Sequence, residues 1–353
     1  DVFGSCTNLS TFQVAEGNSY LSSDRSGILF DKSKTTIVLA PVNVRLTNYS
    51  VPTTVKAIGD YAFSNLTSLS TVTLNNVVHI GEGAFQNCTG LTRVTFNTSS
   101  QALKSIGDMA FFGCTSLRSI ALPEGLETIG ESAFAGCSYA AAGGYTLTVP
   151  DSVTEIGYNA FRMMSMTKLV IGTGVSSLPM QMAAQCSRLT EVEFRGDNVE
   201  EIEGYAFALC TSLTTFTVPD SVKQLGEYAF AACTGLKEVV LSGNMTEIPA
   251  GCFAGCSSLE TYTVPDQIKS VGASAFGAFS FYASEDSAAE NYFCSSLTTV
   301  DLNNVEVIGN FAFQAADKLT QVSADNLKDV GEGAFYGAVA LETISLPSAE
   351  ILR

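Results

Sequence analysis

A motif that recurs along nearly the whole chain constrains the fold more than any other feature. Aligned on Ile-Gly-x-x-Ala-Phe, the copies are most often 22 to 24 residues apart. They start at Ile58, Ile80, Ile106, Ile129, Ile156, Leu178, Ile202, Leu225, Ile248, Val271, Ile308 and Val330, and a partial unit spans Val2 to Val14. A period of this length predicts a solenoid, because stacked repeats bury a continuous core that one repeat cannot form alone.

Each repeat contains an alternating segment and a segment with helix-like spacing, seen most clearly from Ile106 to Thr128. In the V-x-L segment, as at Val94 and Phe96, apolar residues alternate with polar ones, which predicts a short strand. A proline often follows and ends the strand. The A-F-x-x-C-x-x-L segment spaces its apolar residues by three and four, which predicts a short helix or turn on the convex side. The glycine of Ile-Gly is expected to allow a tight turn.

These segments resemble the BspA-like leucine-rich repeats of bacterial and protist surface proteins. The resemblance is carried by IGDYAFSNLTSLSTVTL, IGDMAFFGCTSLRSIALPEGLETIG and LGEYAFAACTGLKEVVL. It implies an α/β repeat fold: one curved, right-handed solenoid over residues 1–353, with about thirteen repeats, the first and last incomplete. Short parallel strands would line its concave face and short helices or turns its convex face. Residues 19–55 are similar to a β-hairpin insertion that such proteins carry near the N-terminus.

The resemblance also implies a function. Members of the family are exported and attach to macromolecules of host or neighbouring cells, and they share no established catalytic residues. It therefore predicts a secreted or cell-surface localisation, with the signal or anchor outside the given chain. The expected partner is a protein or a glycan.

The charge balance excludes several partners. The chain has 18 Lys and Arg against 35 Asp and Glu, a net charge of −17, and no basic cluster. Nucleic acids and anionic lipid surfaces are poor partners, since both require positive charge. No apolar run approaches the roughly 18 residues of a membrane-spanning helix, so direct membrane insertion of this segment is not expected.

Cysteine and histidine usage argues against an enzyme or a metal site. Nine of the ten cysteines occupy one repeat column where other repeats have Leu66 or Ala316, so we expect free, buried thiols. Cys252, four residues before Cys256, leaves open a reversible redox pair. No C-x-x-C pair occurs, and His79 is the only histidine, with no nucleophile motif nearby. We predict no catalytic residues, no metal and no cofactor.

The largest break in the period is the first candidate binding site. Residues 277–293 form a loop insertion that carries five aromatic residues with acidic neighbours at Glu285, Asp286 and Glu290. The candidate contact residues are Phe279, Phe281, Tyr282, Tyr292 and Phe293. Exposed aromatic side chains would serve a protein or glycan contact. The alternative is that they pack back onto the solenoid and cover its side.

The concave strand face is the second candidate. Arg93, Glu191, Glu193 and Arg195 occupy predicted outward strand positions there. The surrounding positions are rich in threonine, which strand propensity alone would favour on a solvated sheet. From both sites we expect a non-catalytic binding or adhesion module. The alternative function is a structural spacer within a larger surface protein.

Overall fold

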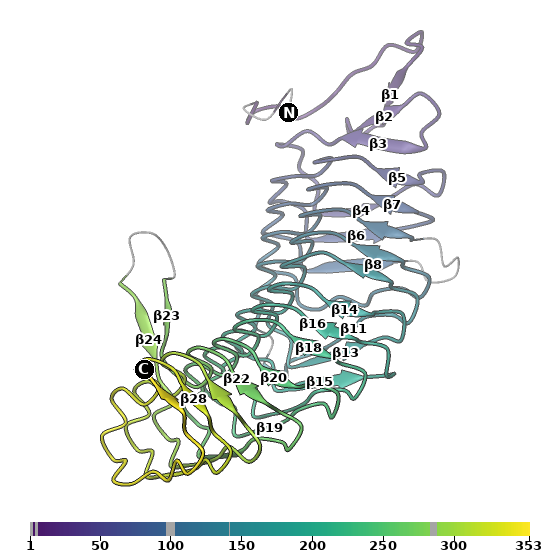
Figure 1. Ribbon diagram of the computed structural model, residues 1–353. Coiled ribbons are helices and arrows are strands. Elements are labelled where there is room, and N and C mark those ends of the chain that lie inside the picture. The colour runs from purple at the N-terminus through teal and green to yellow at the C-terminus, as the bar shows by residue number, and fades with distance from the viewer. Residues whose placement is uncertain (1–2, 4–5, 97–102, 141, 283–287) are drawn as a thin grey trace. The chain divides into compact units, whose positions relative to one another are not determined.

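The computed structural model describes residues 3, 6–96, 103–140, 142–282 and 288–353. The chain divides into two compact units, Asp1–Val175 and Ser176–Arg353. In each unit the strands of successive repeats lie one above another (Figure 1), which confirms the leucine-rich repeat solenoid of stacked parallel strands. Val2, Glu285 and Asp286, which the sequence analysis named, lie outside the described residues.

The V-x-L segments form the first set of parallel strands. In the N-terminal unit these are β4 (Asn48–Ser50), β6 (Thr71–Leu74), β8 (Arg93–Phe96), β11 (Thr146–Thr148) and β13 (Lys168–Ile171). In the C-terminal unit they are β15 (Glu191–Phe194), β17 (Thr215–Thr217), β19 (Glu238–Val240), β21 (Thr261–Thr263), β25 (Thr299–Asp301) and β27 (Gln321–Ser323). Val72 pairs with Val94 and both are buried, as the alternation predicted.

A second set of parallel strands ends at the Ile of each Ile-Gly. In the N-terminal unit it comprises β5 (Ala57–Ile58), β7 (His79–Ile80), β9 (Ser105–Ile106), β10 (Thr128–Ile129) and β12 (Glu155–Ile156). In the C-terminal unit it comprises β14 (Ser177–Leu178), β16 (Glu201–Ile202), β18 (Gln224–Leu225), β20 (Glu247–Ile248), β22 (Ser270–Val271), β26 (Val307–Ile308), β28 (Asp329–Val330) and β29 (Ile351–Leu352).

The glycine that follows this second strand permits close stacking of neighbouring repeats. A Cβ at Gly81 would lie 2.8 Å from the backbone nitrogen of Asp60 in the preceding repeat. Gly81 does not have a positive φ. Its role is therefore close approach between backbones, in place of the tight turn that the sequence suggested.

Antiparallel strands precede the repeat that starts at Ile58. β1 (Leu21–Ser23) pairs with β2 (Leu29–Asp31), which pairs with β3 (Thr36–Leu39). β3 then pairs in parallel with β5, so these hairpins join the second strand set (Figure 1). They lie within residues 19–55, the stretch in which the sequence indicated a hairpin.

The A-F-x-x-C segment is a run of turns, and none of the described residues is helical. The predicted short helices, and with them the α/β class, are therefore not confirmed. Tyr61 and Asn65 have φ of 56° and 60°, so the backbone reverses twice within five residues. The N–H groups of Tyr61 and Phe63 donate to Glu82 and Ala84 in the next repeat, at 2.7 Å each. A helix would direct these bonds within its own segment, so the spacing of three and four reflects successive turns.

A column of phenylalanines fills the centre of each unit. In the N-terminal unit, Phe63, Phe85 and Phe111 stack with ring centroids 5.1 Å apart and planes within 4° of parallel. In the C-terminal unit, Phe207 and Phe230 stack at 5.6 Å. All are at most 1% exposed. Burial of each ring contributes roughly 1.5 to 3 kcal/mol, so the column is a major source of stability in both units.

Candidate functional site

The insertion at residues 277–293 contains a β-hairpin. β23 (Phe279–Phe281) pairs antiparallel with β24 (Glu290–Tyr292), with Phe279 opposite Tyr292. On the outer face the Ser280 hydroxyl donates to the Asn291 side-chain oxygen at 2.7 Å. Figure 1 shows the hairpin projecting from the coil of the C-terminal unit. The predicted loop insertion thus contains a pair of strands, and residues 283–287 between them lie outside the described residues.

The inner face of the hairpin packs on small side chains of three preceding repeats. These form an alanine shelf of Ala208, Leu209, Ala231, Ala232 and Ala254, each at most 8% exposed. Phe279 is buried against the alanine shelf, with Phe281 and Tyr292 partly buried beside it. The Phe279 ring lies 6.0 Å from Tyr228, which stacks on Tyr205 at 4.9 Å. Three of the five aromatic residues named from the sequence therefore attach the hairpin to the solenoid.

Gly255 allows the hairpin to approach this closely. Its φ is +74°, and a Cβ there would lie 2.5 Å from the Cβ of Tyr292. Both the backbone conformation and the space exclude a side chain. The fit indicates that the alanine shelf and the hairpin are complementary surfaces.

Two aromatic side chains remain accessible on the hairpin. Tyr282 is 61% exposed and Phe293 is 40% exposed. Nearby, the Tyr292 hydroxyl donates to Glu290 Oε2 at 2.5 Å. Burial and this hydrogen bond raise the pKa of Tyr292 to about 12, so the phenol stays neutral at physiological pH. The hairpin therefore presents aromatic surface and a carboxylate on a fixed support.

The alanine shelf has a sequence signal that the repeat analysis passed over. The two positions after the repeat phenylalanine are Ala208-Leu209, Ala231-Ala232 and Ala254-Gly255 in these repeats. In early repeats the same positions are polar, as in Ser64-Asn65 and Gln86-Asn87. Consecutive repeats with apolar residues at solvated turn positions indicate that another segment covers them.

The strand-face candidates belong to different units. Arg93 lies at an exposed position of β8 in the N-terminal unit. Glu191 and Glu193 lie at exposed positions of β15, followed by Arg195, in the C-terminal unit. Glu191, Glu193 and Arg195 each have an interaction partner. Within the C-terminal unit these three residues form a mixed-charge stretch at one strand.

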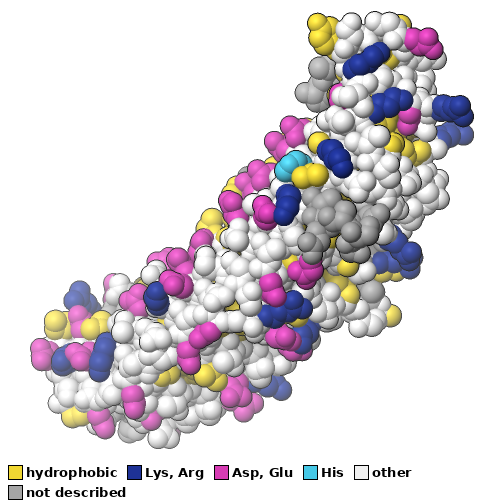
Figure 2. All heavy atoms as spheres, turned by 90° about the vertical axis from the view of Figure 1, so that its right-hand side faces the viewer, with side chains coloured by type: hydrophobic (Ala, Val, Ile, Leu, Met, Phe, Trp, Pro, Cys, Tyr) yellow, Lys and Arg dark blue, Asp and Glu magenta, His cyan; other side chains and the backbone are white. Residues whose placement is uncertain are grey.

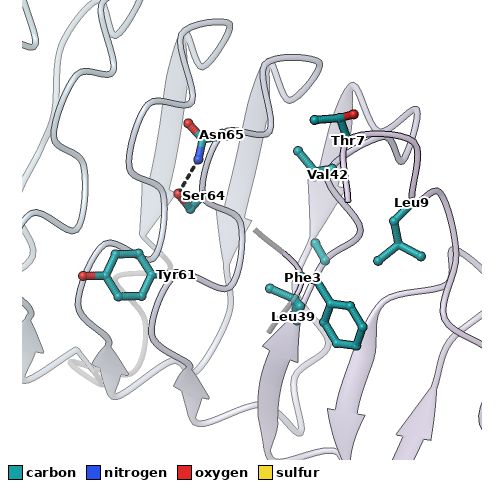
Figure 3. Close-up of a pocket in the computed structure, with 9 residues that line it drawn as sticks. Phe3, Thr7, Leu9, Leu39, Val42, Tyr61, Ser64 and Asn65 are labelled. Atoms are coloured by element: carbon teal, nitrogen blue, oxygen red, sulfur yellow. Dashed lines mark hydrogen bonds between the residues drawn. The ribbon is translucent and has the colours of Figure 1, made fainter. Parts of the chain in front are cut away.

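A small pocket lies beside the first repeats. It has a volume of about 190 Å³ and is lined by Phe3, Thr7, Leu9, Leu39, Ala40, Val42, Tyr61, Ser64 and Asn65. Figure 3 shows Phe3 and Leu39 close together, and Asn65 donating to the Ser64 hydroxyl. Ligand pockets usually hold roughly 300 to 1,000 Å³, so this one accommodates about one side chain.

The cysteine column has a structural role. All ten cysteines are free, and nine are buried, Cys6 being the exposed one. The Cys88 thiol donates to the Phe63 carbonyl of the preceding repeat at 3.0 Å, and Cys233 does so to Phe207 at 3.2 Å. Burial raises the pKa of both thiols to about 12. Burial also raises the pKa of Cys252 and Cys256, which disfavours the thiolate that redox exchange requires.

His79 makes an ordinary cross-strand contact. It is exposed on β7, and its Nδ1 lies 2.8 Å from the Ser105 hydroxyl on β9. Polar residues that face each other on neighbouring strands commonly pair in this way. In the part of the chain that the structure describes, no group of three or more His, Cys, Asp or Glu side chains could hold a metal ion.

Comparison with known proteins agrees with this geometry. The model of the BspA type leucine-rich repeat region matches residues 42–163, 104–233, 154–281 and 286–352. A leucine-rich repeat protein from Bacteroides ovatus has 22% identity and a TM-score of 0.56, over 96% of this chain and 99% of that one. One from Eubacterium ventriosum has 17% identity and a TM-score of 0.52, over 95% and 96%.

Two further searches, for curated relatives and for membrane-spanning helices in the described part of the chain, found no match. No curated protein matches the chain. Among the described residues there is no helix long and apolar enough to cross a membrane. BspA type repeats are generally non-enzymatic, and the two solved structures share the fold of this chain.

Proposed function

We propose that this chain, which belongs to the BspA type leucine-rich repeat family, is a non-catalytic binding module of a secreted or cell-surface protein. It recognises a protein or glycan of a host or neighbouring cell. The observation that carries the proposal is the β23–β24 hairpin, whose inner face is buried on the alanine shelf while Tyr282 and Phe293 stay exposed. The solenoid thereby supports two solvent-exposed aromatic side chains.

Aromatic side chains held on a rigid support favour binding. Tyrosine is enriched among the residues that dominate binding energy at interfaces. A side chain whose backbone is already ordered loses less conformational entropy on association. The cluster formed by Phe279, Tyr228 and the alanine shelf provides this order at the hairpin base.

The negative net charge of the chain favours a partner with a basic surface. The net charge is −17, and Figure 2 shows Asp and Glu side chains spread along the visible face, with Lys and Arg between them. A protein partner is therefore expected to present a basic patch, and its binding should weaken as salt increases. Nucleic acid remains an unfavourable partner for the same reason.

A binding screen with matched variants tests the proposal. The purified chain is screened against extracellular-matrix proteins and a glycan array, beside the double variant Tyr282→Ser/Phe293→Ser. Tyr336→Ser, which changes another exposed tyrosine (69% exposed), is the control. We expect a specific ligand whose affinity falls about tenfold or more in the double variant and is unchanged in the control.

Other outcomes of the screen separate the alternatives. The hairpin site would be contradicted if every specific ligand found in the screen bound the double variant as tightly as the original chain. The absence of any specific ligand would contradict the binding module and favour the structural spacer.

A further inference from the structure

The strand face of β21, β25 and β27 in the C-terminal unit carries two rows of polar side chains. The three strands are parallel and in register, so Thr261, Thr299 and Gln321 form one row, and Thr263, Asp301 and Ser323 form the next. A hollow of about 210 Å³ lies over these rows. A second hollow of about 340 Å³ adjoins it, because both are lined by Asp301 and Ser323.

Together the hollows form a polar trough. Its side chains are Thr261, Thr263, Thr299, Asp301, Gln321, Ser323, Asn303, Asn304, Asp325 and Asn326. Tyr262 and Val300 also border it, but both are buried in the core beneath. The trough is lined by hydroxyl, amide and carboxylate groups, and its lining contains neither a basic nor an exposed apolar side chain.

The asparagines are held in fixed orientations. Asn303 Nδ2 donates to the Val264 carbonyl at 2.7 Å, and Asn326 Nδ2 donates to the Asn303 carbonyl at 3.0 Å. These bonds join successive repeats, so they fix the side chains relative to the strands. The trough is preorganised, which lowers the entropy lost on binding.

The hydroxyl rows, in contrast, are available to a ligand. Among the described residues, no hydrogen bond within the protein engages the side chains of Thr261, Thr263, Thr299, Gln321 or Ser323. The similar face of β4, β6 and β8 differs, since the Thr71 hydroxyl there donates to Asn48 at 2.6 Å and Arg93 adds a positive charge. The trough therefore combines free hydroxyl and amide groups with a lining that has no basic side chain.

We infer that the polar trough binds a neutral oligosaccharide. The inference rests on the proposed function as a binding module and assigns the trough a ligand class. An anionic ligand would meet Asp301 and Asp325 without a compensating cation. An apolar peptide side chain would desolvate hydroxyl and amide groups without replacing their hydrogen bonds. Sugar hydroxyls both donate and accept, and can pair with each group in the trough.

The spacing of the rows supports this ligand class. Neighbouring strands lie about 4.8 Å apart, close to the length of one sugar residue in an extended glycan. A chain lying across β21, β25 and β27 would meet an equivalent pair of polar side chains at each successive residue. A periodic ligand therefore matches the periodic scaffold.

The test uses isosteric substitutions in the intact chain. Thr299→Val/Ser323→Ala removes two hydroxyls from the trough, and Thr73→Val/Ser50→Ala makes the same changes on β4 and β6. Binding of an array of neutral oligosaccharides is measured for both, and for Tyr282→Ser/Phe293→Ser. We expect neutral glycan affinity to fall about tenfold in the trough variant and to be unchanged in the other two.

The outcomes distinguish this inference from the proposed function. Glycan binding that is lost only in the hairpin variant, or a trough that takes only basic peptides, would overturn the trough assignment and leave the binding module standing. The absence of any protein or glycan ligand would overturn both.

Discussion

The turn faces of the two units differ, although the same motif builds both. In the C-terminal unit, the alanine shelf lies beneath the β23–β24 hairpin. In the N-terminal unit the matching positions include Ser64-Asn65 and Gln86-Asn87, and Phe112 there is 37% exposed. The core phenylalanines such as Phe85 and Phe230, and every cysteine except Cys6, are buried in both. In the C-terminal unit, small apolar residues at these two positions thus form the turn face that the hairpin covers, without altering the column beneath.

The thiol columns test whether the two units share the same interior. Burial raises the pKa of Cys88 and Cys137 in the N-terminal unit, and of Cys233 and Cys294 in the C-terminal unit, to about 12. Unfolded thiols ionise near pH 8.5, so the unfolded state loses protons first as pH rises. Stability should be full below about pH 8 and fall by up to roughly 1.4 kcal/mol per thiol per pH unit above about pH 9.

Urea unfolding in reductant at about pH 8 and pH 10 measures this effect in both units. A free energy of unfolding that does not change over that range would contradict buried, protonated thiols. Cys88→Ala should reduce the decrease of the free energy of unfolding per pH unit.

A charge placed in the alanine shelf should destabilise the protein more than a charge at the matching position of the N-terminal unit. Ala231→Glu would put a carboxylate at a position that is 0% exposed, so we expect a loss of about 3 kcal/mol or more. Gln86→Glu changes the matching, half-buried residue of the N-terminal unit and should cost much less, about 1 kcal/mol or below. Denaturant unfolding of both variants gives the difference, and equal effects would refute a buried shelf.

Removal of the hairpin anchor should have a similar or slightly smaller effect. Phe279→Ala deletes a ring that is 8% exposed, and we expect a loss of about 3 kcal/mol, confined to the hairpin and the shelf. Phe112→Ala is the control on the uncovered turn face and should cost less than about 1 kcal/mol. Hydrogen exchange resolved by segment checks both, and hairpin amides that exchange no faster in Phe279→Ala would contradict the anchoring role of Phe279.

Two glycines, Gly255 beneath the hairpin and Gly136 in the N-terminal unit, separate backbone strain from contact with the hairpin. Gly255 and Gly136 have φ of +74° and +75°, so alanine is strained by about 1 to 2 kcal/mol at either position. A Cβ at Gly136 has no neighbour closer than 3.7 Å, whereas one at Gly255 meets Tyr292 at 2.5 Å. Gly255→Ala should therefore cost about 1 kcal/mol more than Gly136→Ala in thermal unfolding. Equal costs would show that the hairpin does not rest on Gly255.

The sequence predicted the solenoid and the V-x-L strands because alternation of buried residues such as Val72 and Leu74 is a local signal. It missed the second strand set, since two residues such as Ala57–Ile58 are too short to show a period. Of the predicted helices or turns, the structure has turns: Tyr61 and Asn65 have a left-handed backbone, and their N–H groups donate to the next repeat. Contacts between repeats cannot be read from one repeat.

The sequence indicated where the candidate site lies along the chain, but not which of its aromatic side chains face the solenoid. The break in the period and its aromatic residues pointed to residues 277–293. Which aromatic residues face inward depends on the register of Phe279 against Tyr292 and on the small side chains of earlier repeats. Both features join segments far apart in the sequence.

Hydrogen–deuterium exchange of Phe279–Phe281 and Glu290–Tyr292 in the unmodified chain measures whether the β23–β24 hairpin is a fixed part of the surface of the C-terminal unit. We predict protection comparable with that of the repeats carrying the alanine shelf. Exchange at the rate of an unstructured peptide would contradict a fixed hairpin.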